Sequence, residues 1–167
     1  NVLFSQKIEI PAVMSQIDFA NEQLESNLQI LGIPTKEISE TMLIFNELIM
    51  NAFEHGSLDL DSQKKERLIE EDGYEEYLLE MEAKGTTKSI VIEMELEGKA
   101  NIGKMLKIGI EDSGSGFDFS ETLKTIYMDK DIRYSGRGVW MAKDLTDGIY
   151  FNEKGNKTTF FKILSIK

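Results

Sequence analysis

The sequence predicts an α+β domain in which helices cover one face of a mixed, mainly antiparallel sheet, giving two layers. Helical periodicity fills the first third of the chain, and period-two alternation dominates the rest. The expected order is therefore strand, two helices, strands, helix, strands. A chain of 167 residues with 41% hydrophobic and 29% charged residues is long and apolar enough for one well-filled core. We expect a single domain over residues 1–167.

The first expected elements are one strand and two helices. Residues 5–10 alternate polar and apolar side chains, which predicts a strand. Apolar residues recur every three or four positions over residues 13–31, which predicts an amphipathic helix that ends at Gly32. A second and unusually apolar helix is expected over residues 35–55, with Gly56 as its C-terminal stop.

The remaining expected elements complete the sheet. Alternating apolar residues predict strands over residues 90–96 and 106–110. A further helix is expected between about residues 138 and 148. Two final strands are expected over residues 149–151 and 158–164.

A charge-rich segment interrupts this pattern at about residues 57–88. Its residues 70–82 contain seven acidic side chains and no basic one, although an apolar helical stripe runs through it and breaks near Gly73. We favour a solvated helical insert that packs one face on the domain. The alternative is a docking or dimerisation surface, which would make the protein a homodimer.

The charge and the composition exclude several classes of function. A net charge of -11 argues against sequence-independent binding to nucleic acid and against docking on anionic membranes. The absence of cysteine excludes disulfides and thiolate chemistry, and the single histidine, His55, excludes a His-rich metal site. His55 is expected to cap helix carbonyls. With no apolar run that could span a bilayer, a cytoplasmic location is expected. Because the chain begins at Asn1, we expect it to be part of a longer regulator.

Glu47 and Asn51 are the polar exceptions in the apolar second helix. Their i, i+4 spacing places them one turn apart on the same face. A carboxylate in a largely buried helix is costly unless it has a partner, so the pair is a candidate site. Taken alone, a helix–helix hydrogen bond or a solvent-facing stripe explains the pair equally well.

Asp112 follows a predicted strand and lies on that strand's core face by period two. Gly114 and Gly116 come directly after it and allow the backbone to approach a ligand closely. A buried carboxylate suits recognition of an exocyclic amine such as that of adenine. The alternative is a turn in which the aspartate caps its own backbone.

Gly136, Arg137 and Gly138 precede an apolar helical stretch. Glycines at a helix start expose N–H groups to an anion, and the helix dipole favours phosphate there. Three further cations lie between residues 117 and 135, which is consistent with covering a polyphosphate. A flexible hinge and a solvated loop are the alternatives.

These three stretches together resemble the N box and the two glycine boxes of the GHKL ATPases, a family that includes DNA gyrase and histidine kinases. The resemblance covers about residues 38–163 and implies the Bergerat fold, with ATP and Mg²⁺ as ligands. The form Asn51-Ala52-x-x-His55-Gly56 and the residues 154–160 near the end are most similar to the anti-sigma factor serine kinases.

The resemblance also implies roles for individual residues. Glu47 corresponds to the catalytic base, Asn51 to the Mg²⁺ ligand and Asp112 to the acceptor for the adenine amine. The other corresponding positions lie beside the nucleotide in the family: Gly114, Gly116, Phe117, Gly136, Arg137, Gly138 and Thr159. Thr159 is chosen because Phe161 and Ile163 continue its side of the last strand.

Four functions are compared. The leading hypothesis is a protein serine kinase that transfers the γ-phosphoryl group of ATP to an anti-anti-sigma protein of the STAS type and also binds a sigma factor. The second is a nucleotide-sensing module that holds a partner without catalysis. The third is the catalytic domain of a histidine kinase, for which His55 is poorly placed as the phosphoacceptor. A purely structural protein is the least favoured.

Overall fold

A five-stranded antiparallel sheet forms one layer of the protein. The computed structural model describes residues 1–101, 103–114 and 144–164. Every pair of neighbouring strands in the described sheet is antiparallel, in the order β1-β2-β3-β5-β4. The strands are β1 (Val2–Pro11), β2 (Ser89–Lys99), β3 (Gly103–Asp112), β4 (Gly148–Phe151) and β5 (Lys157–Leu164). This arrangement confirms the predicted α+β class, with strands that are longer than the alternation alone indicated.

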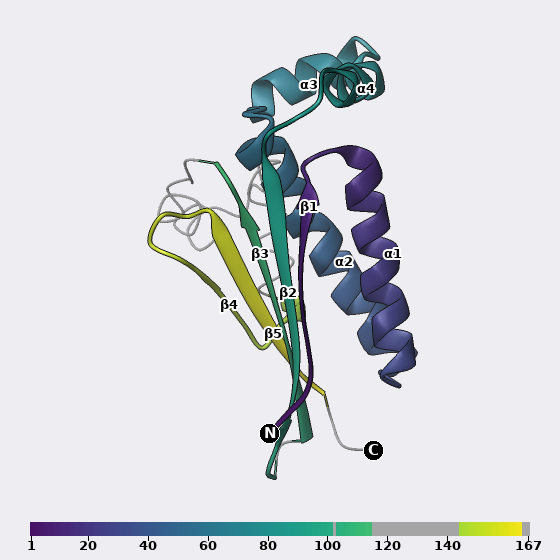
Figure 1. The fold of residues 1–167 in the computed structure, drawn as a ribbon, viewed down its shortest axis with the longest axis vertical. Coiled ribbons are helices and arrows are strands. Elements are labelled where there is room, and N and C mark those ends of the chain that lie inside the picture. Colours follow the sequence, from purple (N-terminus) through teal and green to yellow (C-terminus); the bar gives the residue numbers. More distant parts are fainter. Residues whose placement is uncertain (102, 115–143, 165–167) are drawn as a thin grey trace.

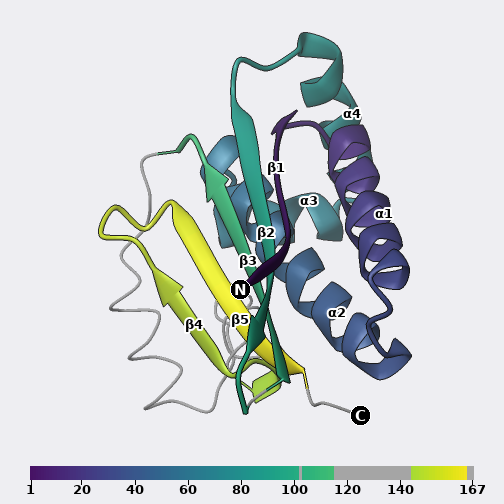
Figure 2. The same ribbon diagram turned by 60° about the horizontal axis from the view of Figure 1, so that its bottom comes forward.

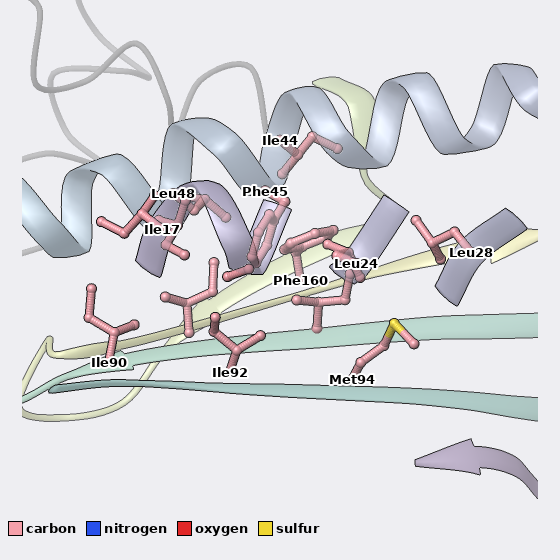
Figure 3. Packing of buried hydrophobic residues seen from close by; sticks show 14 of the residues in the cluster. Ile17, Leu24, Leu28, Ile44, Phe45, Leu48, Ile90, Ile92, Met94 and Phe160 are labelled. Carbon is pink, nitrogen blue, oxygen red and sulfur yellow. The ribbon is translucent and has the colours of Figure 1, made fainter. Parts of the chain in front are cut away.

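Two long helices form the second layer and cover one face of the sheet (Figures 1 and 2). These are α1 (Met14–Ile30) and α2 (Thr35–Asn51), close to their expected bounds. Their periodic apolar residues pack on alternate residues of β2, β3 and β5, as Figure 3 shows with labelled side chains from α1, α2, β2 and β5. Phe45 on α2 and Phe160 on β5 are both completely buried. The core therefore lies between the helices and a single face of the sheet.

The end of the second helix differs from the prediction. Instead of stopping at Gly56, α2 continues into one π-helical turn, η1 (Ala52–Ser57). The backbone N–H of Leu58 donates to the carbonyl of Phe53, which is the i to i+5 pattern of a π-turn. Gly56 therefore lies inside the helical segment, and the π-turn changes the direction in which residues 52–57 face.

The acidic insert consists of two helices, α3 (Ser62–Glu70) and α4 (Tyr74–Lys84), which lie beyond the end of α2 (Figure 1). Asp61 caps α3 by accepting a hydrogen bond from the backbone N–H of Lys64 at 2.7 Å. The apolar stripe of the insert breaks at Asp72, whose positive φ of 56° prevents α3 from continuing. Leu78 is the buried residue of these two helices and joins the main core. The expected helical character of the insert is thus present, as two short helices.

The helix expected before Gly148 falls mostly outside the described residues. Residues 144 and 145 are helical and Leu145 packs on the core. Among the described helices, none combines the length and the apolar character that crossing a membrane requires.

A buried lysine ties the sheet to the second helix. Lys162 on β5 is 3% exposed, and its Nζ lies 2.6 Å from Oε2 of Glu40 and 3.3 Å from Oε2 of Glu37, both on α2. The hydrogen bond from Lys162 holds the pKa of Glu40 below its ordinary value, against the opposing effect of burial. The two carboxylates keep contact with solvent, whereas the ammonium does not.

This asymmetry predicts which partner matters more for stability. The Glu37→Ala/Glu40→Ala variant leaves a buried ammonium without a carboxylate, and we expect its free energy of unfolding to fall by about 3 kcal/mol. Lys162→Met leaves two carboxylates that water reaches, and we expect a loss of about 1 kcal/mol. Chemical denaturation at neutral pH measures both, and equal losses would contradict the assignment.

The same contact predicts an acid dependence. A carboxyl with a lowered folded-state pKa stabilises the fold above its unfolded pKa, and this contribution is lost as the pH falls from 4.5 through the lowered value. We therefore expect the wild type to lose stability more steeply than Lys162→Met in the window below pH 4.5.

Candidate functional site

A small polar cavity lies where α2 meets the insert. It has a volume of about 150 Å³. Glu47 and Asn51 face it from successive turns of α2, His55 reaches it from η1, and Lys65 reaches it from α3. The residues that line the cavity are Asn46, Glu47, Met50, Asn51, Glu54, His55 and Lys65. The structure thus brings together the two polar exceptions of the apolar helix, and it adds a cation from the insert.

Asp112 ends β3 on the face of the sheet that the helices cover, as its pairing with Ile90 and its contact with Gly56 show. Its Oδ1 accepts a hydrogen bond from the backbone N–H of Gly114 at 2.7 Å. The aspartate therefore does cap its own turn, as the simpler interpretation of the sequence required. Burial is the largest cause of its pKa shift and raises the pKa of this carboxyl above the ordinary value.

The turn between β4 and β5 holds the end of β3 in place. The backbone N–H of Asp112 donates to the carbonyl of Asn156 at 2.9 Å, and the Asn156 side chain donates back to the carbonyl of Asp112 at 2.8 Å. Asn152 orders this turn by accepting hydrogen bonds from the backbone N–H groups of Gly155, Asn156 and Lys157. These bonds fix the backbone from which the carboxylate projects.

Two glycines make room for the Asp112 carboxylate. A Cβ on Gly56 would lie 2.3 Å from the carboxyl carbon of Asp112, and a Cβ on Gly114 would lie 2.4 Å from the carbonyl oxygen of Gly56. Both distances are far below van der Waals contact. Gly56 was predicted as a helix stop and as part of the Asn51-Ala52-x-x-His55-Gly56 motif, and neither role predicts this contact. The signal was present in the pair Gly56 and Gly114, but only the fold shows that they meet.

The two polar groups lie at opposite ends of one continuous helical segment. Glu47 and Asn51 line the cavity, while Asp112 lies against Gly56 and does not line that cavity. At 1.5 Å per residue, the segment from residue 47 to residue 56 spans on the order of 13 Å. An elongated ligand laid along this segment would meet an amine acceptor at one end and a carboxylate–amide pair at the other.

Several predicted site residues are placed elsewhere or are not described. Gly116, Phe117, Gly136, Arg137 and Gly138 lie outside the described residues. Thr159 pairs with Gly109 and alternates with Phe160, which faces the helices, so its side chain lies on the opposite face of the sheet from Asp112.

Thr158 is the threonine that shares the helix-covered face. It pairs with Ile110, which lies two residues before Asp112 at the end of β3. Thr159 instead lines a groove of about 500 Å³ on the sheet face opposite α1 and α2, together with Lys107 and Lys157. The strand alternation that grouped Thr159 with Phe161 and Ile163 was correct, but that side of the strand faces away from the site.

Sequence reasoning also missed Glu54 and Lys65. Glu54 is 2% exposed, and its two carboxylate oxygens accept hydrogen bonds from Lys65 and from the hydroxyl of Tyr74, each at 2.9 Å. The signal was a second glutamate within the apolar stretch, three residues after Asn51. Its partners come from the insert, which a local pattern does not reveal.

His55 was expected to cap helix carbonyls, but its partner lies in the link between η1 and α3 and not in a helix. Its Nδ1 lies 2.6 Å from the carbonyl oxygen of Leu60, beyond the end of η1. The imidazole thus links the π-turn to the start of the insert, while its ring borders the cavity.

The polar groups of the site suit a ligand that carries its own charge. Within the described residues, no cluster of three or more histidine, cysteine, aspartate or glutamate side chains is placed to hold a metal ion. The cavity is lined by the amides of Asn46 and Asn51 and by the carboxylates of Glu47 and Glu54, of which the Glu54 carboxylate is bonded to Lys65 and Tyr74. Mg²⁺ is often held by one or two protein oxygens together with substrate phosphates, and this donor set fits that arrangement.

The family model of the histidine kinase-like ATPase domain matches residues 10–162. The match runs from the end of β1 to the last residues of β5 and so includes almost the whole fold, with Glu47, Asn51 and Asp112 inside it. No curated protein matches the chain. The chain belongs to the histidine kinase-like ATPase family, within the GHKL superfamily. Membership supports ATP binding, in a family that includes both kinases and ATPases.

The contact between Gly56 and Asp112 gives a testable prediction. We expect Gly56→Ala to lower the free energy of unfolding by about 2 kcal/mol, because the new methyl group would overlap the carboxylate. Gly73→Ala is the matched control, since the nearest atoms to its Cβ would lie 3.9 Å or more away. We expect the control to change stability by less than about 0.5 kcal/mol.

Adding Asp112→Ala identifies the cause. The double variant Gly56→Ala/Asp112→Ala has room for the methyl group, so the two losses should be less than additive in a double-mutant cycle of denaturation free energies. Full additivity would show that the methyl group and the carboxylate do not collide.

Proposed function

We propose that this protein is an ATP-dependent serine kinase of the anti-sigma factor type, which transfers the γ-phosphoryl group of ATP to a serine of a STAS partner. The observation that carries the proposal is the placement of Glu47 and Asn51 in one cavity, at the opposite end of a helical segment from the half-buried Asp112. The family match supports the ATP-binding part.

Adenine lies at the Asp112 end in this proposal. An ionised carboxylate accepts a hydrogen bond from the exocyclic amine of adenine, and its partial burial strengthens that bond. Gly56 and Gly114 lie directly against the carboxylate, and neither carries a side chain that would cover it further. A base with a carbonyl at the same position would place two acceptors against each other.

The phosphates lie toward Glu47 and Asn51. The Asn51 amide oxygen would hold Mg²⁺ together with phosphate oxygens, and the ion would neutralise charge on the transferred group. The cavity is bordered by α2, η1 and Lys65 of α3, which would partly shield the phosphate end from water. Shielding favours transfer to a protein hydroxyl over transfer to water.

Glu47 is the catalytic base. Its carboxylate accepts the proton of the attacking serine hydroxyl as the serine oxygen forms a bond to the γ-phosphorus, and the bond between that phosphorus and the bridging oxygen of ADP breaks. The products are ADP and a phosphoserine. Such transfer depends mainly on positioning and charge stabilisation, which is what a preformed helix face supplies.

The serine kinase branch is proposed from the form Asn51-Ala52-x-x-His55-Gly56, and the same resemblance suggests that a sigma factor is a further partner. A cytoplasmic location accords with these partners. The alternative function, a module that binds a partner according to its nucleotide state without catalysis, is supported by the acidic insert, whose Lys65 lines the cavity.

Glu47→Ala separates the two functions. We expect it to lower phosphorylation of a cognate STAS protein by at least about 100-fold while ATP affinity stays within a few fold, because the base acts in the transition state. Phosphoserine is measured by mass spectrometry and ATP affinity by calorimetry. Glu25→Ala, an exposed glutamate on α1, is the control and should leave transfer unchanged.

Transfer that persists in Glu47→Ala would exclude Glu47 as the base. A wild type that binds ATP but phosphorylates no cognate STAS protein would favour the binding module.

A further inference from the structure

Glu54 is a buried acid that the proposed catalysis does not use. It lies in η1, and its carboxylate contacts two residues of the insert. The Nζ of Lys65 lies 2.9 Å from Oε1 and 2.8 Å from Oε2, and the Tyr74 hydroxyl donates to Oε2 at 2.9 Å. Lys65 is on α3 and Tyr74 begins α4, so this one carboxylate fixes both insert helices to the end of α2.

The insert is held to the domain at further points. Lys88 and Asp59 form an ion pair at 3.3 Å across the two ends of the insert, and Ser15 of α1 donates a hydrogen bond to Glu82 of α4. Leu78 adds an apolar contact with the core. The position of α3 relative to η1 is therefore set by contacts on both sides of the insert.

An ion pair is an unexpected choice for a purely structural contact here. Removing two charges from water costs free energy, and apolar residues of similar size give equal or greater stability at such positions. Lys64, the residue before Lys65 on α3, makes a cation–π contact with Tyr77, one turn after Tyr74 on α4, so the insert has another way to join its helices. The position of the Lys65 charge suggests a role beyond attachment.

Lys65 lines the same cavity as Glu47 and Asn51. Its side chain is 15% exposed, against 2% for that of Glu54, so the lysine forms the solvent-facing side of the pair. Lys65 is the only lysine or arginine among the described residues that line the cavity. A polyphosphate that enters between two glutamates requires a positive charge nearby, and a lysine ammonium serves phosphate as a point charge.

We propose that Lys65 is a phosphate-positioning residue and that the insert completes the nucleotide site. The inference rests on the proposed function, since it assumes that the phosphates of ATP lie toward Glu47 and Asn51. Glu54 holds the ammonium at the cavity that both residues line, so the insert contributes a side chain to the site. By linkage, phosphates that bind Lys65 also stabilise the docked position of α3 and α4, which connects nucleotide state to the acidic surface of the insert.

The test compares ATP with adenosine, which shares the base and lacks the phosphates. Calorimetric titration with Mg²⁺ is carried out on the whole chain, on Lys65→Met and on Lys65→Arg. We expect Lys65→Met to weaken ATP binding at least tenfold and to leave adenosine affinity unchanged. Lys65→Arg, which keeps the charge, should recover most of the ATP affinity.

Three variants separate charge from attachment. Lys64→Met changes the neighbouring lysine, which does not line the cavity, and should bind ATP as the wild type does. Tyr74→Phe removes a hydrogen bond to Glu54 without removing the cation, and should have little effect on the ratio of ATP to adenosine affinity. Glu54→Met/Lys65→Met removes both charges of the ion pair, so Glu54 is not left as a buried carboxylate that has lost its lysine. This variant should show the same selective loss of ATP affinity as Lys65→Met.

The outcomes distinguish this inference from the proposed function. If Lys65→Met or the double variant binds ATP as tightly as the wild type, or loses ATP and adenosine equally, Lys65 does not position phosphate and the inference is overturned while ATP binding stands. If the wild type binds neither ligand, the proposed function fails and the inference fails with it.

Discussion

The close approach of Gly56 to Asp112 is the constraint on which the site depends. A helix end and a strand end meet there with no side chain between them, so the carboxylate remains partly buried and still faces the helix. The π-turn places Gly56 against the end of β3, and the hydrogen bonds between Asp112 and Asn156 hold that strand end to the turn between β4 and β5. If either side moved by the width of a methyl group, the acceptor would no longer lie along the helix that carries Glu47 and Asn51.

The polar groups of the candidate site lie at the end of an otherwise apolar layer. The core between α1, α2 and the sheet supplies the rigidity, and Lys162 fixes the far part of α2 to β5 with two carboxylates. Because the core and this ion pair hold α2 in place, the site needs few charged residues of its own. In a protein with a net charge of -11, an anionic ligand needs local compensation, and the insert brings Lys65 to the cavity that contains Glu47.

Local periodicity was enough to predict most of the fold and part of the site. Helix spacing located both ends of α1 and the start of α2 within one residue, although the second helix, expected to reach residue 55, ends as α2 at Asn51 and continues as η1. The i, i+4 rule placed Glu47 and Asn51 together. The errors concern contacts between distant segments. Whether Thr158 or Thr159 faces the helices depends on how β5 pairs with β3, and a shift of one residue reverses the faces. Likewise, the periodicity of residues 35–55 does not reveal the π-turn, and the pairing of Glu54 with Lys65 depends on how the insert docks.

Selective adenine recognition by Asp112 tests the account most directly. Calorimetric titration of ATP and GTP with Mg²⁺ should show that the wild type prefers ATP by at least tenfold, because the guanine carbonyl would face the carboxylate. Asp112→Asn should lose most of its ATP affinity, while Asp18→Asn, an exposed aspartate on α1, should not. Equal affinity for ATP and GTP, or ATP binding that Asp112→Asn leaves intact, would contradict the placement of adenine at the end of β3.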